Sequence, residues 1–130
     1  MSEDNHLHEK STREHVVTAD DTAAAVGSGD VPVLGTPRLL AWLEGATVAA
    51  CSHLLDEGYT SVGTKVELRH LKPSYPGSVV VASASLQSRD GRSLTFDVSA
   101  RSKDGDLLAE GTVQRAIVRA SRFIQDDQAE

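Results

Sequence analysis

The pattern of hydrophobic and polar residues predicts a long helix in the first half of the chain. Residues 36–58, "TPRLLAWLEGATVAACSHLLDEG", place apolar side chains around most of the circumference of a helix. Thr36 is a good N-cap, Pro37 suits the first helical position, and Gly58 is placed to end the helix. At 1.5 Å per residue this helix would be roughly 30 Å long. We expect it to be buried on several sides.

The remainder of the chain shows the two-residue alternation of β-strands. Strands are expected over residues 13–20, 61–71, 78–88, 93–102 and 107–120, with a short helical turn at 21–26. The Asp-Gly pairs in "RDGR" and "KDGD" predict tight turns between the last three strands. The fold class is therefore α+β, with the long helix packed on an antiparallel sheet of about five strands.

The length of 130 residues allows one domain with a real core. We assign the domain to residues 12–124, between a disordered polar tail at 1–11 and a frayed end at 125–130. His6 and His8 in the first tail could chelate a metal, although a solvated tail is the preferred interpretation.

Charge and composition exclude several classes of function. The net charge of −6 disfavours nucleic-acid binding and anionic membrane surfaces. The chain has neither an apolar run of about 20 residues that could span a bilayer nor an apolar signal-peptide centre. Its one cysteine, Cys51, rules out an internal disulfide and a multi-thiolate metal cluster, and is interpreted as a core residue. A cytoplasmic protein without a metal site is expected.

Two polar residues stand in apolar surroundings. Glu44 lies within the helix and either faces a narrow solvent strip or is buried, and His70 shares a strand face with Val66 and Leu68. His70 alone could be a core histidine bonded to the backbone. A helix on a sheet brings inward side chains together, so Glu44 and His70 could satisfy each other. Such a pair is also suited to acid–base catalysis.

Three further residues have both a structural and a functional interpretation. Thr36 is a helix cap, or a hydroxyl beside free backbone N–H groups that suit an oxyanion. Gly63 is a turn residue, or a point where a ligand approaches the backbone. Arg115 is interpreted as a surface charge on a strand, with a ligand role as the alternative.

Four segments, in their order and spacing, resemble the hot-dog fold acyl-coenzyme A thioesterases. They are "GTPRLLAWLEGA", "SVGTKVELRHLKPSYPG", "DGRSLTFDVSA" and "GTVQRAIV…RF", and the resemblance covers roughly residues 13–124. It is closest to the branch that includes fluoroacetyl-coenzyme A thioesterase. The fold it implies is a central helix wrapped by an antiparallel sheet.

The resemblance implies catalytic roles for Thr36, Glu44 and His70, which match the family's threonine, glutamate and histidine. It implies substrate-binding roles for Gly63 and Arg115. The implied protein is a homodimer, or a tetramer, that hydrolyses an acyl-coenzyme A or acyl-carrier thioester, with no cofactor beyond its substrate. The segment "DVPVLG" has no phenylalanine where the fluoroacetyl enzyme has an aromatic lid, so its preference for fluorine is not carried over.

Two other functions remain open at this point. A non-catalytic acyl-binding hot-dog domain would need no buried polar site, and an enoyl hydratase of the same fold could use the same acid–base pair. The sequence leaves open the acyl group, the thioester carrier, and whether Glu44 acts as a base or as a nucleophile.

Overall fold

The computed structural model describes residues 9–124 of the chain, so His6, His8 and residues 125–130 lie outside it. Its main elements are β1 (Lys10–Val16), α1 (Ala23–Val26), α2 (Thr36–Cys51), β2 (Tyr59–His70), β3 (Val79–Asp90), β4 (Ser93–Ser102) and β5 (Leu107–Arg119). Short 3-10 turns cover Ala19–Asp21, Ser52–Leu54 and Ala120–Phe123. The predicted antiparallel sheet and single long helix are both confirmed.

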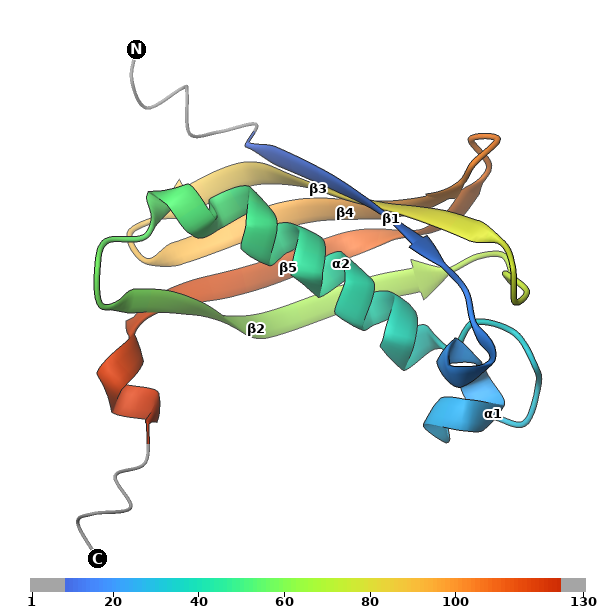
Figure 1. Ribbon diagram of the computed structural model, residues 1–130. Coiled ribbons are helices and arrows are strands. Elements are labelled where there is room, and N and C mark those ends of the chain that lie inside the picture. The colour runs from blue at the N-terminus through green and yellow to red at the C-terminus, as the bar shows by residue number, and fades with distance from the viewer. Residues whose placement is uncertain (1–8, 125–130) are drawn as a thin grey trace, which may run out of the picture.

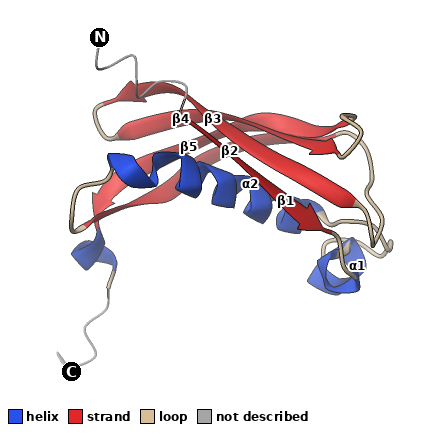
Figure 2. Ribbon diagram, turned by 45° about the horizontal axis from the view of Figure 1, so that its top comes forward, coloured by secondary structure: helices blue, strands red, loops and turns tan. Residues whose placement is uncertain are grey.

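The sheet has five strands in the order β1-β3-β4-β5-β2, so β1 and β2 are its two edges. All neighbouring pairs are antiparallel. Helix α2 crosses one face of this sheet, and α1 lies beside the N-terminal end of α2 (Figures 1 and 2). The two predicted Asp-Gly turns are present, with Gly91 and Gly105 at positive φ.

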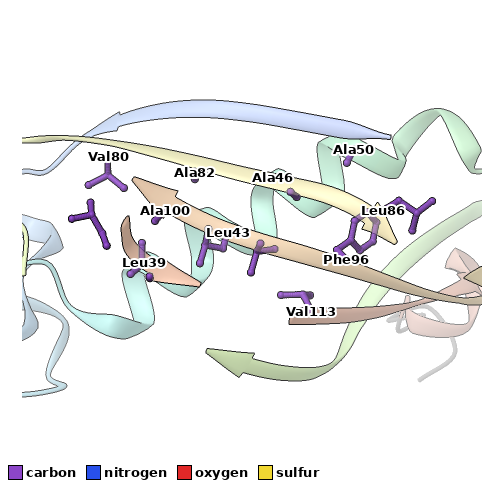
Figure 3. Close-up of a cluster of buried hydrophobic side chains, with 14 of the residues drawn as sticks. Leu39, Leu43, Ala46, Ala50, Val80, Ala82, Leu86, Phe96, Ala100 and Val113 are labelled. Atoms are coloured by element: carbon purple, nitrogen blue, oxygen red, sulfur yellow. The ribbon is translucent and has the colours of Figure 1, made fainter. Parts of the chain in front are cut away.

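The core lies between α2 and the three central strands. Leu39, Leu43, Ala46 and Ala50 of the helix point at the inward residues of β3, β4 and β5 (Figure 3). Several of these sheet residues are alanines, and the small side chains let the helix lie close to the strands. Cys51 is buried in the same cluster, as predicted.

Helix α2 differs from its prediction at both ends. It ends at Cys51, which makes it about 24 Å long. Ser52 bonds through its side chain to the carbonyl of Ala49 and a 3-10 turn follows, so Gly58 belongs to the turn before β2. The predicted N-cap is also wrong, because Gly35 occupies the cap and Thr36 is the first helical residue.

The first strand also begins earlier than predicted. Lys10 and Ser11, which we assigned to the tail, pair with Ser85 and Ala84 of β3. The strand ends at Val16, and the residues that follow form a 3-10 turn. This polar edge strand is held by backbone hydrogen bonds, which leave little hydrophobic pattern in the sequence.

The core predicts a clear contrast in stability between two substitutions. Leu43 is fully buried, so Leu43→Ala should lower the free energy of unfolding by about 2–5 kcal/mol. Val16→Ala removes an exposed side chain and should change it by less than about 0.5 kcal/mol. Urea denaturation of both variants measures the difference, and equal losses would contradict the packing described.

Candidate active site

The first part of the site lies at the N-terminal end of α2. The hydroxyl Oγ1 of Thr36 lies 2.8 Å from Nδ1 of His70, the last residue of β2. A neutral imidazole with an unprotonated Nδ1 accepts the threonine proton in this hydrogen bond. Thr36 therefore uses its hydroxyl for a contact with the sheet and not as a helix cap.

A β-bulge in β2 changes which of its residues face the helix. Gly63 and His70 are seven residues apart, so in a regular strand they would face opposite sides of the sheet. The register shifts between Gly63 and Lys65. Gly63, before the shift, lies opposite Arg115, and His70, after it, lies opposite Ala109. Arg115 and Ala109 both face the helix side, and so do their partners.

Burial lowers the pKa of His70 from its ordinary value, and the backbone of Lys72 partly offsets this effect by raising it. The neutral form is therefore the main form near neutral pH. A neutral His70 can accept a proton from Thr36 or from a bound water, as a general base must.

The second part of the site lies further along α2, at Glu44. Its Oε2 atom lies 3.8 Å from Nη1 of Arg115, and its side chain is 36% exposed. Its carboxylate rests against Gly63, where an added Cβ would come within 2.6 Å of Oε2. Gly63 thus leaves room for the carboxylate, a structural reason for glycine beyond the two that the sequence suggested.

Arg115 is buried, so its interpretation as a surface charge was wrong. Ser61 fixes its guanidinium with two contacts, from Nε to Oγ at 2.8 Å and from Nη2 to the carbonyl oxygen at 3.0 Å. Its Nη1 atom lies 3.5 Å from the hydroxyl of Thr47. These contacts leave Nη1 directed at the region of Glu44.

Sequence reasoning missed Ser61 and Thr47. Ser61 stands two residues before Gly63 and shares its strand face, and Thr47 stands three residues after Glu44 and shares its helix face. These spacings could have identified them only once Gly63 and Glu44 were known to be neighbours.

The predicted contact between Glu44 and His70 does not form within one chain. Thr36, the hydrogen-bond partner of His70, lies eight helical residues from Glu44, or about 12 Å along the axis. Gly63, which Glu44 touches, lies roughly 20 Å from His70 along β2. The prediction treated inward-facing residues as neighbours and ignored their positions along the two elements. One chain holds two separated half-sites, Thr36–His70 and Glu44–Arg115.

A hollow of about 270 Å³ adjoins the first half-site. Its lining combines the polar side chains of Thr36, His70 and Lys72 with apolar ones such as Val31, Val33 and Leu71. A larger hollow of about 910 Å³ lies on the far face of the sheet, among polar side chains. We place the candidate site at the smaller hollow because neither half-site contributes a residue to the lining of the larger one.

Comparisons with known proteins identify the family of this chain. The family described as fluoroacetyl-CoA-specific thioesterase matches residues 17–121. The chain belongs to this family. It is 35% identical over 92 residues to the fluoroacetyl-CoA thioesterase of Streptantibioticus cattleyicolor, a match that spans 70% of this chain and 65% of that relative.

Solved structures support the same grouping. A structure of fluoroacetyl-CoA thioesterase has a TM-score of 0.83 at 29% identity, covering 90% of each chain. A hot-dog-like protein from Thermanaerovibrio acidaminovorans has a TM-score of 0.82 at 21% identity, covering 95% of this chain and 92% of that one, which bears on the fold alone. The predicted family and hot-dog fold are thus confirmed.

Among residues 9–124, no group of three or more His, Cys, Asp or Glu side chains is arranged to hold a metal ion. Within the same residues, no helix is both long and apolar enough to cross a membrane.

The environment of His70 predicts a specific titration. Its pKa should lie below 6.5, so its NMR signal should change only at more acidic pH. Between 6.5 and the folded-state pKa the unfolded chain binds more protons, so the free energy of unfolding should fall as pH drops through this window. Over that window the free energy of unfolding of His70→Asn should fall less than that of the wild type. The pKa of His15 is also lowered, so His15 makes the same pH-dependent contribution to the stability of both proteins. Titration of His70 at or above 6.5 would contradict this description.

Proposed function

We propose that this chain is an acyl-coenzyme A thioesterase that hydrolyses a thioester to a free acid and coenzyme A. The observation that carries the proposal is the hydrogen bond between Thr36 and a neutral His70 at a helix N-terminus, in a chain of the thioesterase family. The reaction needs no cofactor beyond the coenzyme A of the substrate. A cytoplasmic location fits this substrate and stays part of the proposal.

The active site combines half-sites from two copies of the chain. Thr36 and His70 of one copy face Glu44 of the other, because the two groups cannot meet within one chain. Exposed apolar residues beside the half-sites support a homodimer. Val48 of α2 is 46% exposed and Val66 of β2 is 37% exposed, and β2 is an edge strand. A second copy would bury this apolar face and complete the site.

The chemistry follows from the two half-sites. The thioester carbonyl lies beside Thr36, where free backbone N–H groups at the start of α2 stabilise the negative charge that forms on oxygen, while the Thr36 hydroxyl donates to His70. Glu44 takes a proton from a water molecule that adds to the carbonyl carbon, or Glu44 itself adds to that carbon. The C–S bond then breaks, and the coenzyme A thiolate leaves and takes up the proton that Glu44 or His70 removed from water. If Glu44 itself has added to the carbon, water then hydrolyses the acyl–Glu44 anhydride to the free acid and the Glu44 carboxylate. Arg115 balances the charge of Glu44 and keeps its carboxylate in place.

The acyl group is short or of medium length. The hollow beside Thr36 is lined by Val31, Val33 and Leu71, with no aromatic lid in the segment "DVPVLG". Discrimination by one methylene in such an apolar pocket amounts to about 1–3 kcal/mol. We therefore propose several accepted acyl groups and little preference for fluoroacetyl over acetyl.

A panel of acyl-coenzyme A thioesters with a thiol reagent tests the activity. Release of free thiol supports hydrolysis. Binding without turnover across the panel would replace the proposal by an acyl-binding domain, and addition of water to an enoyl thioester would replace it by a hydratase.

Substitutions in the two half-sites should affect turnover more than folding. Glu44→Gln and His70→Ala should each lower kcat by about 10²-fold or more, the usual contribution of general acid–base groups. The double variant should be little worse than the worse single one, because residues acting as a unit are not additive. Steady-state kinetics and thermal melts on the same samples measure both properties. A folded Glu44→Gln protein with near-wild-type activity would rule out the assignment.

Mixing two inactive variants tests the composite site. In a mixed dimer of Glu44→Gln and His70→Ala chains, one site receives His70 from the first chain and Glu44 from the second, and is intact. Random exchange at equal amounts should therefore restore about one quarter of wild-type activity. A site contained within one chain predicts no recovery, and mixing either variant with itself is the control.

A further inference from the structure

Two arginines surround one tyrosine at the start of β2. The guanidinium carbons of Arg92 and Arg119 lie 5.5 and 5.4 Å from the ring centroid of Tyr59. Nη2 of Arg119 also lies 3.3 Å from the tyrosine hydroxyl. We call these three residues the arginine–tyrosine cluster. Cation–π contacts hold both guanidinium groups near a ring that is itself packed against the core.

The cluster carries concentrated positive charge on a protein whose net charge is −6. None of the ion pairs found within residues 9–124 involves Arg92 or Arg119. Both arginines are exposed, so most of their N–H donors face solvent. Guanidinium groups held in this way match the paired oxygens of a phosphate.

The cluster lies on the same side of the sheet as Glu44. Tyr59 pairs with Arg119, and Gly63, four residues later, pairs with Arg115, so both pairs face the helix side. The backbone of Arg92 lies next to β5 near these pairs, because its carbonyl accepts a hydrogen bond from the amide of Ile117. The distance along β2 from Tyr59 to Gly63 is about 13 Å. The extended pantetheine arm of coenzyme A is longer than this.

We propose that the arginine–tyrosine cluster binds the phosphate groups of the nucleotide end of coenzyme A. This inference rests on the proposed thioesterase function and deepens it. Glu44 then marks the reacting end of the substrate, and the cluster marks its anionic end. The site would prefer free coenzyme A thioesters to thioesters on a carrier protein, whose pantetheine is attached through one phosphodiester and lacks the nucleotide.

Binding of adenosine 3′,5′-bisphosphate to the full-length protein tests the site without any turnover. Calorimetry should show that the wild type binds it and that Arg92→Gln/Arg119→Gln binds at least about tenfold more weakly. Arg101→Gln, which lines the hollow on the other face of the sheet, is the matched control and should bind like the wild type. Arg92→Gln alone should give an intermediate loss if the double variant is unstable in a thermal melt. No binding by the wild type, or equal binding by all variants, would overturn the proposal.

The substrate preference gives a second test. The ratio of kcat/KM for acetyl-coenzyme A to that for acetyl-pantetheine should fall at least about tenfold in the double variant. An unchanged ratio, or a preference of the wild type for an acyl-carrier protein that the double variant loses, would overturn the inference. Bisphosphate binding in a protein that hydrolyses no thioester would instead contradict the proposed function and leave the phosphate site standing.

Discussion

The β-bulge after Gly63 determines which side chains of β2 face the helix. Before it, odd-numbered residues such as Ser61 and Gly63 point toward α2, and after it even-numbered residues such as His70 do so. A regular strand would turn one of these two groups to the far face of the sheet. The glycine is needed at the same place because the carboxylate of Glu44 occupies the space of a side chain. One local irregularity thus positions both half-sites.

Much of the fold could be predicted from the sequence because its signals are local. The Asp-Gly turns, the two-residue alternation and the long apolar segment each depend on neighbouring residues, and they located β2, β3, β4, β5 and the start of α2 closely. The first strand was harder, since its polar residues are held by pairing with β3, a contact that local pattern does not carry. The end of α2 was missed because Leu54 and Leu55 remain packed on the core after the helix has stopped.

The contacts among the candidate site residues differ from those that the sequence predicted. Glu44 and His70 were selected as polar residues in apolar surroundings, Thr36 as a hydroxyl at the start of the helix, and all three by the family resemblance. Which of them touch depends on where α2 crosses β2, a tertiary property. The structure pairs His70 with Thr36 and Glu44 with Arg115. Arg115 was misjudged for a similar reason, because burial of an arginine requires partners such as Ser61 that lie 54 residues away in the chain.

The mechanism depends on the proposal that each active site needs two copies of the chain. Its most direct test is the specific activity measured across a dilution series, with sedimentation at the same concentrations. Activity should fall in proportion to the dimer fraction, and the isolated monomer should be inactive although folded in its core. A monomer that hydrolyses thioesters as fast per chain as the dimer would contradict it.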